Sequence, residues 1–179
     1  QSDFAIADTA SVTKIIINHK GEGDVTLERI DGLRWKLNDT YYARPDAVQL
    51  LLKTFNRISV KSPVNEATTA TVVRNMASSG KVVQIFTHGQ SEPEKIYHLG
   101  MSVHDQLGNY MILEQNGEVA ESAYITHIPG FHGYLSTRFF VEEHLWRDRT
   151  IFNHGLAEIK KFTLTNAEKP DQSFSCLLY

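Results

Sequence analysis

Cysteine, proline and long apolar runs are all scarce in this chain of 179 residues. Its one cysteine, Cys176, can form no internal disulfide, which excludes the small secreted scaffolds that disulfides hold together. The longest apolar runs, such as Ile15-Ile16-Ile17 and Leu50-Leu51-Leu52, are far shorter than the roughly 18 to 20 residues that cross a bilayer as a helix. No transmembrane helix is therefore predicted within the sequence.

Positive charge is also limited, because 18 Lys and Arg stand against 21 Asp and Glu, for a formal charge of −3. No segment carries the clustered basic residues that nucleic-acid binding requires, so nucleic acid is not an expected partner. What the chain does have is 41% hydrophobic residues. A globular chain of this length can bury a core without a structural metal.

The first 58 residues predict a three-stranded antiparallel meander followed by a helix. Alternating apolar residues favour strands, and Gly21-Glu22-Gly23 and Asp31-Gly32 are typical turn sequences between them. The expected strands cover residues 12–18, 24–29 and 33–37. The helix should begin near Pro45 and cover the meander. Its apolar stripe consists of Val48, Leu51, Leu52, Phe55 and Ile58.

The rest of the chain predicts a second meander. Residues 59–64 should be extended, and a helix over 66–78 should have Asn65 as its N-cap and end at Gly80. Further strands are expected at 82–86, 95–99, 110–113, 122–127, 158–165 and 173–178, with a short helix near 138–145. The predicted class is α+β, with two antiparallel meander sheets, two main helices and a terminal hairpin.

The sequence also matches itself. Residues 12–17 align with 159–164, and 25–27 align with 174–176, so that the apolar positions coincide. The first copy is followed by a tryptophan-containing strand and a long helix, whereas the second stops at Tyr179. We therefore expect an α+β domain over residues 4–150, and a hairpin over 151–179 that begins a truncated second repeat.

The segment from His127 to Tyr134 is the first candidate site, because it holds two imidazoles in a glycine-containing loop. A metal bound by His127 and His132 is one interpretation, but no further ligand follows at a recognised spacing. The alternative is a tight turn whose aromatic residues, Phe131 and Tyr134, pack on the sheet. We favour the turn.

Three other patterns are candidate sites. A hydrolase could use the imidazoles of His98 and His104 with the carboxylate of Asp105. The sequence has, however, no GxSxG nucleophile motif, and no GxGxxG or GxxxxGK[ST] phosphate loop. A glycan or lipid fragment would instead use aromatic residues, among them Tyr41 and Tyr42. The segment 146–152 predicts a structural clasp or an arginine anchor for a partner.

These patterns predict no enzyme: no catalytic residue, no cofactor and no metal ligand is expected. The candidate interaction residues are His127, Phe131, His132, Tyr134, Arg147 and Arg149. Edge strands of the meanders could accept a partner by strand addition. The alternative function is a hydrolase, or a domain that binds a small ligand through the histidine- and aromatic-containing loops.

Several separated motifs carry a resemblance to a known family. They are DFAIADTASVTKI (residues 3–15), VKSPV (60–64), DQLGNYM (105–111), HIPGFHGYL (127–135) and WRDRTIF (146–152). In this order they resemble an uncharacterised family of Gram-negative envelope proteins, the domain of unknown function numbered 4340.

This resemblance implies a location and a kind of partner. Such proteins have a short N-terminal membrane helix followed by an exported region longer than this chain. The expected location is the periplasmic face of the inner membrane, with contact to the membrane only through an N-terminal anchor absent from this sequence. The expected function is a non-enzymatic interaction or scaffolding domain that binds another envelope protein, auxiliary to a transport system. The family has no established catalytic residues.

Overall fold

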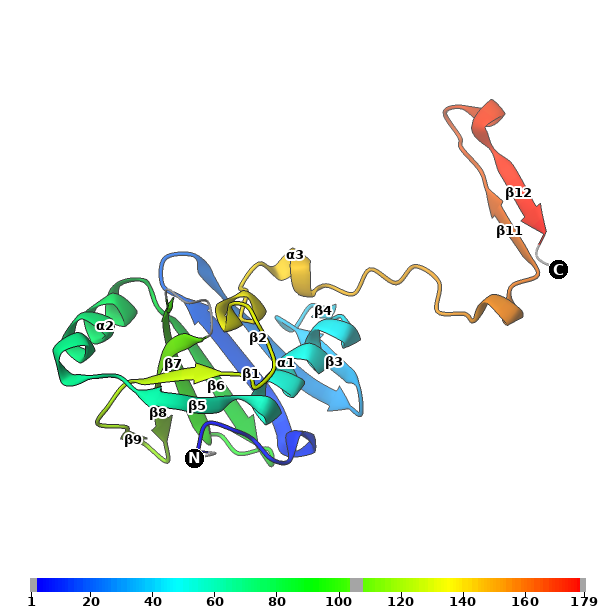
Figure 1. Ribbon diagram of the computed structural model, residues 1–179. Coiled ribbons are helices and arrows are strands. Elements are labelled where there is room, and N and C mark those ends of the chain that lie inside the picture. Colours follow the sequence, from blue (N-terminus) through cyan, green and yellow to red (C-terminus); the bar gives the residue numbers. More distant parts are fainter. Residues whose placement is uncertain (1–2, 104–107, 178–179) are drawn as a thin grey trace. The chain divides into compact units, whose positions relative to one another are not determined.

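The computed structural model describes residues 3–103 and 108–177, and the chain forms two compact units, Gln1–Asp148 and Arg149–Tyr179 (Figure 1). The first unit holds an antiparallel sheet with three helices, in agreement with the predicted α+β class. Within the described residues, no helix is long and apolar enough to cross a membrane.

Ten strands of the first unit form one sheet, in the order β4-β3-β2-β1-β6-β7-β8-β10-β5, with β9 paired to β8. The strands are β1 (Val12–His19), β2 (Gly23–Asp31), β3 (Arg34–Leu37), β4 (Tyr41–Tyr42), β5 (Ser59–Pro63), β6 (Lys81–Thr87), β7 (Lys95–Ser102), β8 (Asn109–Gln115), β9 (Glu118–Val119) and β10 (Tyr124–His127). Every adjacent pair is antiparallel.

The expectation of two separate meander sheets is wrong. Strand β1 pairs with β6, with Ile15 opposite Ile85 and Ile17 opposite Val83, and this pairing joins the two meanders into one sheet. All four side chains are fully buried. Turn residues predict which consecutive strands pair, but they carry no information about pairing between strands that are far apart in the chain.

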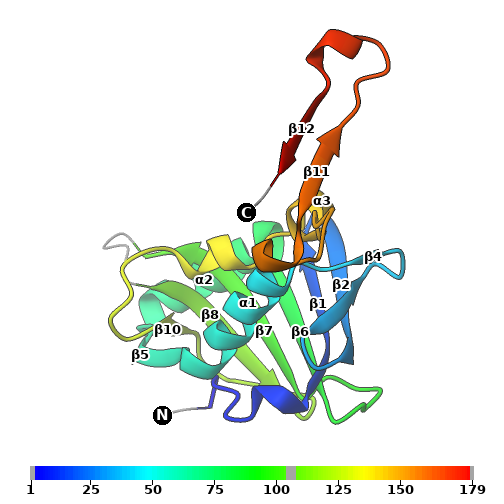
Figure 2. The same cartoon turned by 90° about the vertical axis from the view of Figure 1, so that its right-hand side faces the viewer.

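Two longer helices pack on opposite faces of this sheet. Helix α1 (Pro45–Arg57) lies across one face (Figure 2), and its predicted apolar stripe is buried in the main core. Helix α2 (Glu66–Ser79) packs on the other face, with Val72 and Met76 against Tyr110 and Ile112 of β8. Met111 lies between these two residues on β8 and belongs to the core that contains α1. Because successive strand residues point to opposite faces, α1 and α2 lie on opposite faces of the sheet.

The predicted ends of α2 are confirmed. The side-chain oxygen of Asn65 accepts a hydrogen bond of 2.8 Å from the Thr68 N–H, which satisfies one of the free donors of the first turn. The N–H of Gly80 donates to the carbonyl of Met76 at 2.9 Å and closes the last turn. Helix α2 thus begins at the predicted residue and extends one residue beyond the predicted Ser78.

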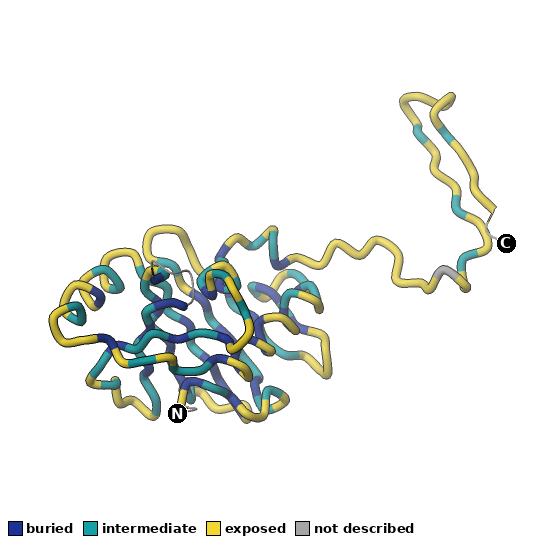
Figure 3. The backbone as a smooth tube through the Cα atoms, viewed as in Figure 1, coloured by how far each residue is buried: buried dark blue, intermediate teal, exposed yellow. Residues whose placement is uncertain are grey.

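The core of the first unit lies mainly between α1 and the sheet (Figure 3). Its largest fully buried side chains include Trp35, Tyr97, Phe55, Phe139 and Trp146. Aromatic rings contact one another there, with the Phe55 ring centroid 5.9 Å from that of Tyr97 and 6.2 Å from that of Phe139.

The helix expected near 138–145 is replaced by a 3-10 turn, Leu135–Arg138, and a short helix, α3 (Glu143–Trp146). Two backbone carbonyl groups within the expected helix accept hydrogen bonds from side chains. The Lys81 ammonium donates to the carbonyl of Phe139 at 2.7 Å, and the Trp146 indole N–H donates to that of Phe140 at 2.9 Å. These bonds stabilise the observed backbone of residues 138–145 relative to a continuous helix.

The segment that follows α3 covers the β4 edge of the sheet. The Arg44 N–H donates to the carbonyl of Trp146 at 2.7 Å, the Asp148 N–H donates to that of Tyr42 at 2.8 Å, and Arg147 forms a β-bridge with Ala43. Trp146 is fully buried. Residues 146–148 therefore act as a clasp on β4.

The second unit contains the predicted terminal hairpin. Strands β11 (Lys161–Leu164) and β12 (Phe174–Leu177) pair antiparallel, joined through a 3-10 turn at Pro170–Gln172. Most of its described residues are exposed (Figure 3).

Candidate functional site

The loop from His127 to Tyr134 is fastened to the body of the first unit. The Arg57 guanidinium donates to the carbonyl of Pro129 at 3.2 Å, and the Arg138 guanidinium lies 4.2 Å from the Phe131 ring centroid. Arg138 also donates to the Thr54 hydroxyl at 2.9 Å. Phe131 thus contacts other parts of the fold.

The two imidazoles of this loop differ in exposure. His127 is half-buried on β10, whereas His132 is exposed and Tyr134 is 38% exposed. Within residues 3–103 and 108–177, no group of three His, Cys, Asp or Glu side chains is placed to hold a metal ion. His104 and Asp105, two members of the other histidine cluster, lie outside the described residues.

The arginine candidates belong to different units. The Arg147 guanidinium stacks on Tyr41 of β4, with its carbon 3.8 Å from the ring centroid. Arg149 belongs to the C-terminal unit. Arg147 thus takes part in the clasp on β4 while its side chain stays exposed.

A groove that the sequence did not predict lies between α2 and the strands on the α2 side of the sheet. Its volume is about 380 Å³. The apolar part of its lining consists of Val73, Met76, Ala77, Val82, Ile112 and Val119. Val73 is 43% exposed and Val119 is 58% exposed, so the groove opens between two accessible apolar side chains.

Two glycines set the approach of α2 to the sheet. A Cβ atom on Gly80 would lie 2.4 Å from the Met76 carbonyl oxygen and 2.7 Å from that of Leu99, so no larger residue fits there without movement. A Cβ atom on Gly100 would meet the flexible Met76 side chain at 3.0 Å. Gly80 itself lines the groove, which therefore depends on this close packing.

Several polar groups of the groove have partners within the protein. The His98 imidazole nitrogen lies 3.2 Å from a carboxylate oxygen of Glu114 on the neighbouring strand. The Lys20 ammonium donates to the carbonyl of Ala77 at 2.7 Å, near the end of α2. No Ser, Thr or Cys occurs among the described lining residues to act as a nucleophile beside His98. The groove therefore suits apolar contact better than acyl-transfer chemistry.

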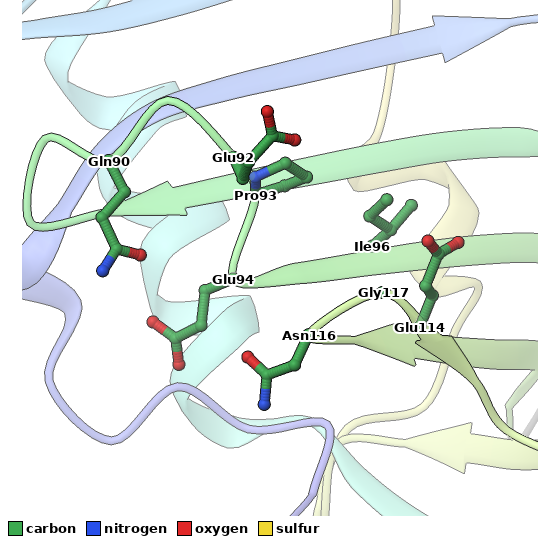
Figure 4. A pocket seen from close by; sticks show the side chains of 8 residues that line it. All are labelled: Gln90, Glu92, Pro93, Glu94, Ile96, Glu114, Asn116 and Gly117. Carbon is green, nitrogen blue, oxygen red and sulfur yellow. The ribbon is translucent and has the colours of Figure 1, made fainter.

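A second cavity, of about 410 Å³, adjoins the groove at Glu114, which lines both (Figure 4). Glu92, Glu94 and Asn116 also line it, and the Glu94 and Asn116 side chains extend toward the same side in Figure 4. The Glu94 carboxylate accepts a hydrogen bond from the Thr87 hydroxyl. One end of the groove is therefore flanked by negative charge.

Buried ionisable groups of the first unit serve the fold. Lys95 is 6% exposed, and burial lowers the pKa of its ammonium group. Burial also lowers the pKa of Lys81, whose ammonium group holds the 136–139 turn, and the Glu142 charge partly offsets that effect. Burial raises the pKa of the Tyr97 phenol, which donates to the carbonyl of Phe4.

The sequence motifs did not predict the groove, although the residue alternation in β7 indicates part of its lining. In β7, the alternation of Lys95, Tyr97 and Leu99 with Ile96 and His98 predicts that the last two lie on the opposite face. Which segment covers that face depends on the position of α2, and periodicity alone does not give it.

The fold and groove define an α+β protein whose ten-stranded antiparallel sheet carries helices on both faces. Comparison with known proteins finds no matching family model, and no match among curated proteins or solved structures.

Proposed function

We propose that this chain is a non-enzymatic interaction domain that binds a protein partner through the groove beside α2. The observation that carries the proposal is an accessible apolar groove, bordered by Val73 and Val119, whose His98 and Lys20 groups are paired within the protein. Accessible apolar surface with a polar rim is typical of sites that bind other proteins.

The sheet face is a better docking surface than the sheet edges. Residues 146–148 already occupy the β4 edge, so strand addition is blocked there. The opposite edge strand, β5, carries Lys61 and Pro63, residue types that discourage strand pairing. We therefore place partner binding on the groove, and the expected route by strand addition loses its support at β4.

The charge beside the groove defines the kind of partner. Glu92, Glu94 and Glu114 line the adjoining cavity. A partner segment that inserts an apolar side chain between Val73 and Val119 would gain attraction from a neighbouring Lys or Arg. Exposed charge pairs affect association rate and choice of partner more than affinity.

The proposed location rests on the family resemblance alone. We propose that the domain acts at the periplasmic face of the inner membrane, held by an N-terminal anchor, and that its partner is another envelope protein with a role in transport. A reporter that is active only outside the cytoplasm, fused after the full reading frame, tests this location. The proposed location would be contradicted if this reporter is inactive and a reporter that is active only in the cytoplasm, fused at the same point, is active.

Capture from detergent-solubilised envelope of the native cells tests the binding function. We expect the full-length protein to retain a partner, and Val73→Asp to reduce its recovery at least tenfold. Leu50→Asp is the matched control, because Leu50 is 45% exposed but lies on α1, on the other face of the sheet. Equal recovery with wild type and Val73→Asp would refute the role of the groove, provided that both variants keep the wild-type circular dichroism.

A further inference from the structure

The C-terminal hairpin is amphipathic. In its register, Phe162 lies opposite Cys176 and Leu164 lies opposite Phe174, so these four side chains share one face. The other face carries Lys161, Thr163, Ser175 and Leu177, with the Thr163 and Ser175 hydroxyl oxygens 2.9 Å apart. One face of the hairpin is therefore wholly apolar, and the other is mainly polar.

This register reproduces that of the β1–β2 hairpin under the alignment of the two sequence segments. The pair Phe162 and Cys176 aligns with Ile15 and Leu27, which are themselves opposite each other. The next apolar pair behaves in the same way: Leu164 and Phe174 correspond to Ile17 and Val25. The polar pair between them, Thr163 and Ser175, corresponds to Ile16 and Thr26.

The two hairpins differ in what covers the corresponding face. Ile15, Ile17, Val25 and Leu27 are all fully buried, in the core that also contains the apolar stripe of α1. In the C-terminal unit, Phe174 is 49% exposed and Leu164 is 40% exposed. The C-terminal hairpin thus has the same kind of apolar face as the β1–β2 hairpin, but two of its side chains, Leu164 and Phe174, are exposed.

Local contacts do not cover that face. The Phe162 ring lies 6.1 Å from that of Phe152 and 6.0 Å from that of Phe174, yet Phe152 is itself 63% exposed. A hollow of about 680 Å³ remains, lined in part by Phe152, Ile159, Phe162 and Cys176. Because a two-stranded hairpin alone is marginally stable in water, covering this face would stabilise it.

We propose that the apolar face of the β11–β12 hairpin is a docking surface for an amphipathic helix with an apolar stripe like that of α1. The occupant follows from the matched hairpin in the first unit, where a helix with Val48, Leu51 and Phe55 on one side contributes to the covering core. This surface is separate from the groove beside α2 and does not depend on its function.

Cys176 supplies a direct probe, because it is the one cysteine of the chain, is exposed, and lies on the apolar face. Its rate of reaction with a disulfide reagent is measured in the 179-residue protein as a synthetic peptide of residues 44–58 is added. This peptide contains the α1 stripe and has no cysteine. We expect the reaction rate of Cys176 to fall at least tenfold when the peptide is saturating. The mixture should also show more helical circular dichroism than the separate components.

Two variants and a control peptide define the result. Phe174→Asp should abolish the protection, whereas Ser175→Asp, on the polar face of the same strand, should keep it. A peptide with Leu51→Asp and Phe55→Asp should give none. An unchanged rate at millimolar wild-type peptide would overturn the proposal. A rate that falls with protein concentration alone would also overturn it, because a second copy would then cover the face.

Discussion

The Lys95 ammonium group donates a hydrogen bond of 2.8 Å to the carbonyl oxygen of Ala5, in the interior of the first unit. The same group donates to the carbonyl of Asp3. A charged side chain in a core-facing position of β7 therefore holds the N-terminal segment against the sheet, beside the bond from the Tyr97 phenol to Phe4.

Replacing this lysine tests that attachment. Lys95→Met keeps most of the side-chain volume but leaves the carbonyls of Asp3 and Ala5 without their donor. We expect the free energy of unfolding to fall by about 1–3 kcal/mol, since a buried polar group loses its partner. Urea unfolding measures this loss, and limited proteolysis should cut the N-terminal segment faster. A variant as stable as wild type would show that removal of the buried charge offsets the lost bonds.

The buried phenol of Tyr97 predicts an alkaline loss of stability. Because burial raises its pKa in the folded state, the unfolded chain releases the phenolic proton first as the pH rises past its ordinary value of about 10. The unfolded state then binds fewer protons than the folded state, so stability falls with rising pH, by up to about 1.4 kcal/mol per pH unit.

Tyr97→Phe removes this dependence. At pH 7 the variant should be less stable by about 1 kcal/mol, because it lacks the hydrogen bond to Phe4. Above about pH 10 the difference should shrink, and it should reverse near pH 11. Urea unfolding at several pH values gives the two curves, and Tyr134→Phe controls for the number of phenols. Parallel curves from pH 7 to 12 would contradict the expectation.

The order of helices and strands in the first unit was largely predictable, because it depends on local signals. The Asn65 cap, the start of α1 at Pro45 and the alternation in β7 each act within a few residues. The pairing of β1 with β6 was not predictable, since both meanders carry the same kind of apolar alternation. The continuous helix expected near 138–145 does not form, because the Lys81 ammonium and the Trp146 indole donate to the carbonyls of Phe139 and Phe140.

The candidate site was predictable only in part. The candidate site was placed on the loop of His127 and His132, which Arg57 and Arg138 contact through Pro129 and Phe131. Val73 and Val119, which border the groove, are ordinary apolar residues. Their exposure depends on where α2 rests, and that is a property of the tertiary structure.

The clasp on β4 predicts different effects for two adjacent residues. Trp146→Ala removes a fully buried indole that stacks on Phe140 at 4.2 Å, so the free energy of unfolding should fall by about 3–5 kcal/mol. Arg147→Ala removes an exposed stacking contact with Tyr41 and should cost no more than about 1 kcal/mol. Thermal or urea unfolding compares them.

The same pair separates the two interpretations of this segment. If Arg147 is an anchor for the proposed partner, Arg147→Ala should reduce capture of that partner although the variant stays folded. A structural clasp predicts full capture by Arg147→Ala. A loss of less than 1 kcal/mol in Trp146→Ala would contradict the clasp itself.

Gly80 is required for a reason other than the one its sequence position indicates. A glycine after a helix commonly adopts a left-handed conformation, but Gly80 has φ −77° and ψ 164°, which other residues also adopt. Its constraint is space, because a Cβ atom would collide with the Met76 and Leu99 carbonyl oxygens. Gly80→Ala should therefore push α2 away from β7 and cost about 1–3 kcal/mol in the free energy of unfolding.

Gly100→Ala is the matched control on β7. Its added methyl group would meet the side chain of Met76, which can change rotamer, so we expect a smaller loss of stability. Because Gly80 lines the groove, Gly80→Ala should also weaken partner capture, even at temperatures where the variant remains folded. Equal losses of stability in the two variants would show that contact with the helix backbone does not set the position of α2.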